Sequence, residues 1–224
     1  MIPGSLGILG GTFDPIHHGH LAIAEEVREV LGLERVLFVP ASVPPHRAAP
    51  PGATAEDRAR MVELAIAGNP AFSMSRIELD RDGPSYTVDT LSLLAAERAG
   101  RPDPVFILSA EAASGLPDWH DPRGVLRLAR LAVVPRAGAP ALGPGWAAER
   151  FPDQAARFAW LDAPLLPVSG SVVRARAAAG RSVRYLVPEP VARYIDDHRL
   201  YRSARTAAAP ATAGGSAPLE DPTQ

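Results

Sequence analysis

The 224-residue chain contains no cysteine, and all 23 of its basic residues are arginine. The absence of cysteine excludes disulfides, thiolate nucleophiles and cysteine-ligated zinc or iron–sulfur sites. The absence of lysine excludes a Schiff-base enzyme and the lysine of a Walker-type phosphate loop. Any chemistry that the chain performs therefore uses other side chains or backbone groups.

Excess charge of one sign and long apolar runs are also absent. The formal net charge is −2, which predicts no bulk attraction to nucleic acid or to an anionic membrane. No apolar stretch approaches the ~20 residues that a membrane helix needs, and no basic segment followed by an apolar segment marks a signal peptide. We therefore expect a cytoplasmic protein with neither a nucleic-acid partner nor a membrane partner.

Short apolar runs alternate with amphipathic segments along most of the chain. The runs predict strands at residues 5–9, 36–39, 72–80, 105–108, 131–134 and 158–161. The amphipathic segments predict helices at 18–31, from 54 onward, 86–98, 125–128, 169–179 and 188–201, with at most one helix in 137–156. This alternation predicts an α/β fold with a doubly wound, open parallel sheet in a single domain, residues 1–201. Residues 202–224 lack apolar periodicity and are expected to form a disordered tail.

A glycine-rich turn, GGTFDPIHHGH at residues 10–20, separates the first strand from the first helix. Glycines let backbone N–H groups approach a phosphate, and the helix N-terminus is positive. His17 and His20 are spaced i, i+3 and can both donate to phosphate oxygens. A metal site is the alternative for the two histidines, but a third ligand is missing nearby. The turn therefore predicts a nucleoside triphosphate site.

A second segment, residues 168–174, combines hydroxyls and an arginine at the start of a late helix. Ser169 and Ser171 can bind phosphate together with the free N–H groups, and Arg174 on the first turns adds charge. The alternative is that the serines only cap the helix and that Arg174 is a solvated surface charge. Together with the first motif, this segment predicts a second phosphate clamp.

The two segments resemble the two signatures of the HxGH nucleotidyltransferase superfamily, G-x-F-D-P-x-H-x-G-H and Ile-Ser-Ser-Thr-x-Ile-Arg. Within it, the chain resembles the bacterial nicotinate-nucleotide adenylyltransferases from end to end, apart from the tail. The resemblance implies a Rossmann-like nucleotidyltransferase fold and an enzyme of NAD biosynthesis. Such an enzyme transfers the adenylyl group of ATP to nicotinate mononucleotide, giving deamido-NAD and pyrophosphate. The resemblance also implies Mg²⁺ bound mainly through the ATP phosphates, so we predict no protein metal ligand.

The resemblance assigns roles to individual residues. The implied catalytic residues are His17, His20 and Arg174. The implied ATP contacts are Gly10, Gly11, Thr12, Phe13, His17, His20, Ser109, Glu111, Ser169, Ser171 and Arg174. The implied substrate contacts are His46 and Arg47 in the proline-rich loop 41–53, Tyr86 and Thr87 at the nicotinate ring and its carboxylate, Trp119 stacked on the pyridine ring, and Arg136 after the strand 131–134.

One segment departs from the family pattern. The chain has Ser109-Ala110-Glu111 after the strand 105–108, where the family usually has Gly-Ala-Asp. The added Cβ and the longer acid can shift an ATP contact by about 1 Å. A non-catalytic nucleotide-binding protein therefore stays open, as does an adenylyltransferase of the same fold that acts on nicotinamide mononucleotide or phosphopantetheine. The oligomeric state also stays open, with a homo-oligomer among the alternatives.

Overall fold

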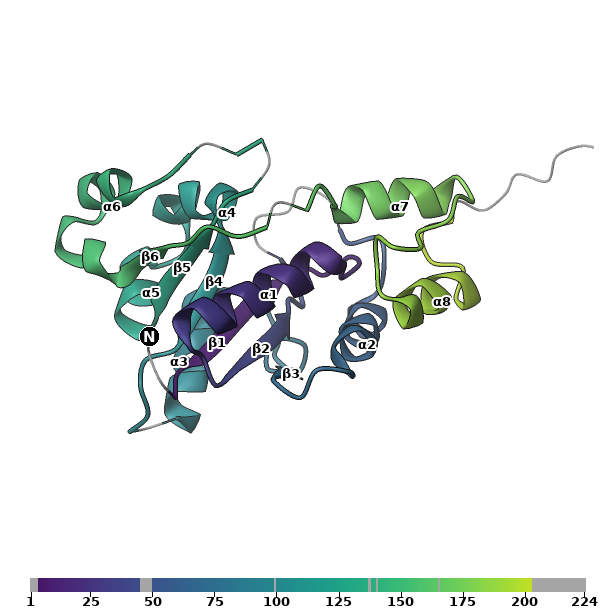
Figure 1. Ribbon diagram of the computed structural model, residues 1–224. Coiled ribbons are helices and arrows are strands. Elements are labelled where there is room, and N and C mark those ends of the chain that lie inside the picture. Colours follow the sequence, from purple (N-terminus) through teal and green to yellow (C-terminus); the bar gives the residue numbers. More distant parts are fainter. Residues whose placement is uncertain are drawn as a thin grey trace, which may run out of the picture.

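A six-stranded sheet with the strand order β3-β2-β1-β4-β5-β6 forms the centre of the molecule (Figure 1). The computed structural model describes residues 4–44, 50–98, 100–136, 138–139, 141–164 and 166–202. The strands are β1 (Leu6–Gly11), β2 (Arg35–Pro40), β3 (Phe72–Met74), β4 (Val105–Ser109), β5 (Arg130–Val134) and β6 (Phe158–Trp160). Each neighbouring pair is parallel, and the order reverses between β1 and β4. The predicted doubly wound, parallel sheet is confirmed, and ligands bind such sheets at the point of reversal.

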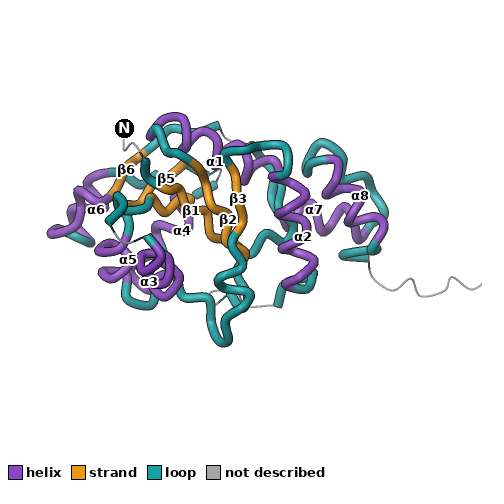
Figure 2. Tube along the Cα trace, turned by 90° about the horizontal axis from the view of Figure 1, so that it is seen from below, coloured by secondary structure: helices purple, strands orange, loops and turns teal. Residues whose placement is uncertain are grey.

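Helices cover both faces of the sheet. They are α1 (His18–Leu31), α2 (Ala55–Ile66), α3 (Thr87–Glu97), α4 (Ala110–Ser114), α5 (Pro122–Leu128), α6 (Pro144–Arg150), α7 (Gly170–Ala178) and α8 (Glu189–Asp197), with short 3-10 helices η1 (Leu116–Asp118) and η2 (Pro152–Arg157). Figure 2 shows α3 and α5 on one side of the strands and α1 on the other. Among the described residues, no helix is long and apolar enough to cross a membrane.

The central strands are apolar on both faces because each face carries its own core. In β4, Val105 and Ile107 pack into the cluster that contains side chains of α1, α2, α7 and α8. Phe106 and Leu108 pack into the opposite cluster with side chains of α3 and α5. Successive strand residues point to opposite faces, so a strand buried on both sides has a continuous apolar run.

The predicted strand at 72–80 is wrong in length. Strand β3 ends at Met74, and the following residues form a turn in which the Asp80 N–H donates to the Arg76 carbonyl at 2.9 Å. The turn brings the Glu78 carboxylate inward, where the Thr90 hydroxyl donates to it at 2.6 Å. Strand β3 lies at the edge of the sheet and pairs with β2 alone. Edge strands are often short, and this one has three residues.

Two other predicted boundaries also differ. The last helix, α8, ends at Asp197 instead of residue 201, and the chain then turns through left-handed conformations at Arg199 and Tyr201, with φ of 51° and 64°. The Leu200 N–H closes this end by donating to the Ile195 carbonyl at 3.0 Å. The segment 137–156 was expected to hold at most one helix, but η2 starts within it after α6.

Candidate active site

A cleft of about 1050 Å³ lies where β1, β4 and β5 end. The predicted site residues that line it are Gly10, Gly11, Thr12, Phe13, His17, His20, Tyr86, Thr87, Ser109, Glu111, Trp119, Arg136, Ser169, Ser171 and Arg174. Each predicted site residue in the described part of the chain therefore lies in the wall of one cleft. The other two, His46 and Arg47, lie outside the described residues.

Gly10 and Gly11 form the end of β1 and Gly19 lies in the first turn of α1, and at each of them a ring packs against the backbone. A Cβ on Gly10 would lie 3.3 Å from the Phe106 ring, and a Cβ on Gly11 would lie 3.2 Å from the Phe13 ring. A Cβ on Gly19 would lie 3.0 Å from Nδ1 of His17. The glycine between the two histidines therefore makes room for the first imidazole against the helix.

The two histidines lie at the start of α1, where His17 is the N-cap residue and His20 the third helical residue. Their rings stack with 3.7 Å between centroids. The His17 N–H donates to Nδ1 of His20 at 3.2 Å, so neutral His20 carries its proton on Nε2. Nδ1 of His17 is buried and has no hydrogen-bond partner among the described residues.

Both imidazoles are neutral at physiological pH. Burial and the nearby charges of Arg136 and His18 lower the pKa of His17 to about 4. Burial, His17 and Arg136 hold the pKa of His20 well below its usual value. Neutral rings do not repel the positive end of α1, and each can donate one hydrogen bond to a phosphate oxygen.

The start of α7 forms the facing wall of this part of the cleft. Ser169 is its N-cap residue and accepts a hydrogen bond from the Val172 N–H at 3.3 Å, while its hydroxyl lies 2.9 Å from that of Ser171. The capping alternative is therefore correct for Ser169, without excluding a phosphate. A Cβ on Gly170 would lie 2.8 Å from the Asp14 carbonyl. Glycine at this position thus lets α7 approach the turn after β1, a packing role that the sequence did not indicate.

The opposite end of the cleft is lined by aromatic rings. Tyr86 is the N-cap residue of α3, and its ring stacks on His120 with 4.4 Å between centroids. Trp119 is half-buried, and its ring meets that of Phe106 edge-on, with 6.3 Å between the ring centroids. The first N–H groups of α3, from Thr87 onward, begin at this wall. This end therefore offers flat apolar surfaces and a positive helix end to a ligand that combines a ring with an anion.

Ser109, Glu111 and Arg136 meet at the ends of β4 and β5. The Ser109 hydroxyl caps α4 by accepting a hydrogen bond from the Ala112 N–H at 3.2 Å. Arg136 and Glu111 form an ion pair at 2.9 Å, although the sequence predicted them as contacts of two different ligands. Both side chains are exposed, so the pair itself contributes little stability.

Three buried charged residues in or beside the cleft were not predicted from the sequence: Asp14, Arg58 and Glu78. Asp14, in the turn after β1, accepts a hydrogen bond from the Ala53 N–H before α2 at 3.1 Å, and Arg58 on α2 donates to the carbonyls of Thr12 and Ala41, both at 2.7 Å. Burial raises the pKa of the Glu78 carboxyl, against the lowering effect of its hydrogen bond from Thr90. Arg58 continues the apolar stripe of α2 through Met61 and Val62, which is the one signal that could have indicated its burial.

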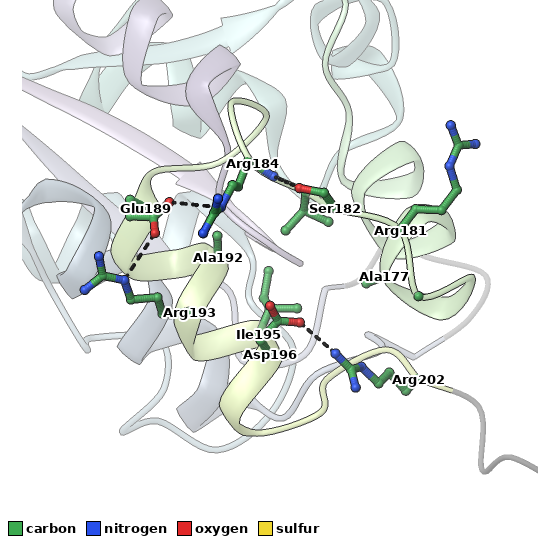
Figure 3. Close-up of a pocket in the computed structure, with 12 residues that line it drawn as sticks. Ala177, Arg181, Ser182, Arg184, Glu189, Ala192, Arg193, Ile195, Asp196 and Arg202 are labelled. Carbon is green, nitrogen blue, oxygen red and sulfur yellow. Dashed lines mark hydrogen bonds and ion pairs between the residues drawn. The ribbon is translucent and has the colours of Figure 1, made fainter.

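A second hollow of about 430 Å³ lies between α7 and α8 (Figure 3). Two of the arginines that line it pair with acids of the same region: Arg193 donates to Glu189 at 3.2 Å, and Arg202 donates to Asp196 at 2.7 Å. None of the predicted site residues in the described part of the chain lines this hollow. The larger cleft is therefore the candidate active site.

The sequence is similar to those of known proteins along most of its length. The cytidylyltransferase-like family matches residues 8–176. A protein of Roseiflexus sp. (strain RS-1), named "Probable nicotinate-nucleotide adenylyltransferase", is 48% identical over 201 residues, which are 88% of this chain and 98% of that protein. A protein of Thermomicrobium roseum with the same name is 43% identical over 204 residues, covering 88% and 92% of the two chains.

Solved structures share the fold at much lower identity. The Plasmodium falciparum nicotinic acid mononucleotide adenylyltransferase complexed with APC superimposes with a TM-score of 0.71 at 15% identity. The match covers 88% of this chain and 97% of that one. At this identity the likeness concerns the fold alone.

Proposed function

This chain belongs to the nicotinate-nucleotide adenylyltransferase family, and from that premise we propose that it transfers the adenylyl group of ATP to nicotinate mononucleotide. The products are deamido-NAD and pyrophosphate, in a step of NAD biosynthesis. One observation supports this proposal most strongly: a single cleft joins two phosphate-binding helix starts, those of α1 and α7, to a wall of aromatic rings at the start of α3.

The ATP phosphates would bind between the starts of α1 and α7. An oxygen of the mononucleotide 5′-phosphate attacks the α-phosphorus of ATP in line, and the bond from that phosphorus to the bridging oxygen breaks, releasing pyrophosphate. His17 and His20 donate hydrogen bonds to phosphate oxygens, and Arg174 adds a positive charge. No protein nucleophile is needed, because positioning and charge stabilisation account for the catalysis of such transfers.

The nicotinate end of the second substrate would bind at the aromatic wall. Trp119 offers its ring face to the pyridine, and the N–H groups at the start of α3, beside Tyr86 and Thr87, suit the carboxylate. Arg136 lines the same cleft and pairs with Glu111, and it stays a proposed substrate contact. His46 and Arg47 stay predicted substrate contacts.

Magnesium fits this site as a companion of the triphosphate. It prefers oxygen ligands and keeps several waters. Its chemistry favours the phosphate oxygens of ATP and water as ligands, so it would bind mainly through the nucleotide. When bound, it neutralises charge on the phosphates. The cytoplasmic location stays a prediction.

A pyrophosphate-release assay with magnesium and ATP tests the proposal. The second substrate is nicotinate mononucleotide, nicotinamide mononucleotide or 4′-phosphopantetheine, with product identity checked by mass spectrometry. We expect kcat/KM to be about tenfold or more higher for the acid than for the amide, because the start of α3 favours an anion. A higher kcat/KM with another acceptor would reassign the substrate. ATP binding without pyrophosphate release from any acceptor would instead indicate a non-catalytic nucleotide-binding protein.

A further inference from the structure

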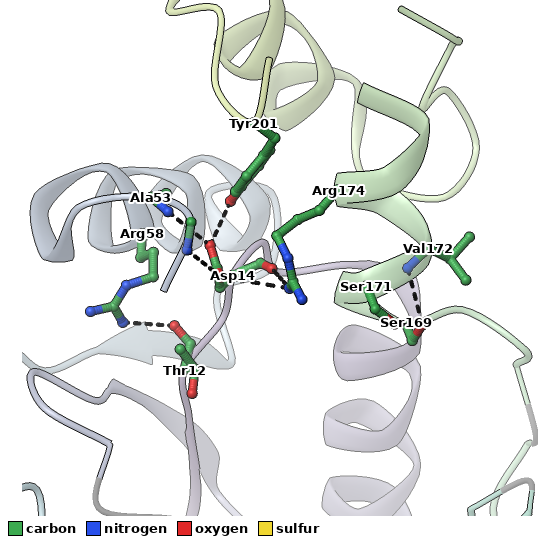
Figure 4. A network of polar contacts seen from close by, with 10 residues as sticks. Thr12, Asp14, Ala53, Arg58, Ser169, Ser171, Val172, Arg174 and Tyr201 are labelled. Atoms are coloured by element: carbon green, nitrogen blue, oxygen red, sulfur yellow. Dashed lines mark hydrogen bonds and ion pairs between the residues drawn. The ribbon is translucent and has the colours of Figure 1, made fainter. Parts of the chain in front are cut away.

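Asp14 connects the phosphate-binding turn to three other segments of the chain (Figure 4). Asp14 is only 4% exposed. Its Oδ2 accepts from the Gly52 N–H at 2.9 Å, and its Oδ1 accepts from the Ala53 N–H at 3.1 Å and from the Tyr201 hydroxyl at 3.0 Å. The segment before α2 and the last turn of the described chain therefore both hold this carboxylate in place.

Arg174 of α7 is the fourth partner. Its Nη1 donates to the Asp14 backbone carbonyl at 2.6 Å and lies 3.5 Å from Oδ2 of the same residue. Within the described residues, the polar contacts of Arg174 all pass through Nη1. A guanidinium carries five N–H donors in a fixed plane. Nε and Nη2 thus keep their donors for a ligand in the cleft.

Tyr201 and Arg174 also share a packing surface. A Cβ on Gly52 would lie 3.0 Å from the Tyr201 ring and 3.3 Å from Cδ of Arg174. The ring and the aliphatic part of the arginine therefore pack against the same backbone. Tyr201 holds a left-handed φ of 64°, a conformation that persists only where surrounding contacts enforce it. Burial and the charge of Asp14 raise the pKa of the Tyr201 hydroxyl, so it remains a donor at physiological pH.

We propose that Tyr201 and Asp14 are positioning residues that set the guanidinium of Arg174 for the ATP phosphates, an inference that rests on the proposed adenylyl transfer. The Asp14 charge competes with phosphate for Arg174. Two backbone N–H groups and the Tyr201 hydroxyl stabilise the carboxylate by hydrogen bonds, so its stabilisation does not depend on Arg174 alone. Without the hydroxyl, Oδ1 keeps only one of these donors, and the carboxylate draws Arg174 away from the phosphate.

The chain offers a matched control for the loss of this hydroxyl. Tyr194 on α8 donates to Oδ1 of Asp57 on α2 at 2.9 Å. This bond has the same chemistry and joins the same C-terminal region to the rest of the fold. Tyr194 does not line the described cleft. Tyr201→Phe and Tyr194→Phe therefore each remove one tyrosine–carboxylate hydrogen bond, but only the first acts on Arg174.

The experiment compares both variants with the full-length wild-type chain in the pyrophosphate assay and in calorimetric ATP titrations. We expect Tyr201→Phe to lower kcat about tenfold and to weaken ATP binding about fivefold, with the KM for the mononucleotide changed less than about twofold. Tyr194→Phe should change kcat, ATP affinity and the KM for the mononucleotide by less than about twofold. Its Tm should fall by about as much as that of Tyr201→Phe.

Equal kinetics and ATP affinity for the two variants would overturn the inference, and so would a Tyr201→Phe effect that falls equally on both substrates. Gly52→Ala displaces the Tyr201 ring while keeping its hydroxyl, and it should move kcat and ATP affinity in the same direction as Tyr201→Phe. The ATP titration needs no turnover. A wild-type chain that binds ATP without releasing pyrophosphate would therefore refute the proposed function and still allow Tyr201 to be tested.

Discussion

At the residue scale, the stacked pair of His17 and His20 explains why two histidines stand on either side of a glycine at the start of α1. The His17 N–H fixes the tautomer of His20 through a 3.2 Å hydrogen bond. Burial and Arg136 keep both rings neutral. Gly19 leaves the space that the His17 ring fills. The histidines are therefore preset as neutral donors before any phosphate arrives.

Replacing His20 with alanine should abolish most of the activity and leave the fold native. The variant loses a donor preorganised toward charge that grows on the phosphates, and such a loss lowers kcat by about 100-fold or more. Steady-state pyrophosphate release measures kcat, and circular dichroism checks the fold. His18→Ala is the control, because His18 is in the same turn but is not among the described residues that line the cleft. Turnover of His20→Ala near that of His18→Ala would remove His20 from the mechanism.

At the scale of the element, α2 holds the ends of β1 and β2 in register through one buried arginine. Arg58 is 1% exposed, and its guanidinium donates to the carbonyls of Thr12 and Ala41 at 2.7 Å and of Ser42 at 3.3 Å. These carbonyls follow the two strands that meet beside the phosphate-binding turn. The helix therefore supports the site although no residue of α2 lines the described cleft.

Arg58→Met should lower the free energy of unfolding by about 3–5 kcal/mol, because methionine replaces only the aliphatic part of the side chain and leaves three carbonyls without their donor. Arg60→Met on the same helix removes an exposed arginine whose partner is Glu63, and should change that free energy by about 0.5 kcal/mol or less. Urea unfolding at constant m-value measures both. A difference under about 1 kcal/mol between the variants would show that the Arg58 contacts do not stabilise the fold.

The elements that the sequence predicted well are those whose signal is local. The apolar runs of β1, β4 and β5 are buried on both faces, and Gly32 ends α1 in the left-handed conformation that its position indicated. The phosphate motifs were also found, because they are short and contiguous. The predicted length of β3 was wrong because Glu78 turns inward to Thr90 on α3, and no local pattern reveals this contact. Asp14 was missed because its partners lie 38, 39, 160 and 187 positions away.

At the scale of the whole molecule, the chain folds back so that its last helices complete a site begun by its first strand. Figure 1 shows α7 and α8 beside α2, apart from β5 and β6. The His18 N–H donates to the Leu186 carbonyl at 3.0 Å, and Arg174 binds Asp14. The phosphate half of the cleft thus depends on contacts between the two ends of the described chain, whereas the aromatic half is built from its middle.

This architecture makes the stability of the whole molecule dependent on pH through the buried histidines. The folded pKa of His17, about 4, lies below its ordinary value of 6.5. Between these two pH values the unfolded chain binds a proton that the folded chain does not, so acidification favours unfolding. The difference corresponds to about 3 kcal/mol of unfolding free energy lost by pH 4 from this residue.

Urea unfolding at steps between pH 6.5 and 4.5 isolates this effect, because most carboxylates titrate below that window. We expect the unfolding free energy of the wild type to fall steadily with pH. The unfolding free energy of His17→Gln should fall less over the same range, since glutamine carries no titrating proton. That of the double variant His17→Gln/His20→Gln should fall least. The ring of His20 is also held neutral by burial, so its removal further reduces the pH dependence of the unfolding free energy. Parallel curves for all three proteins would mean that the histidines at the start of α1 do not link protonation to folding.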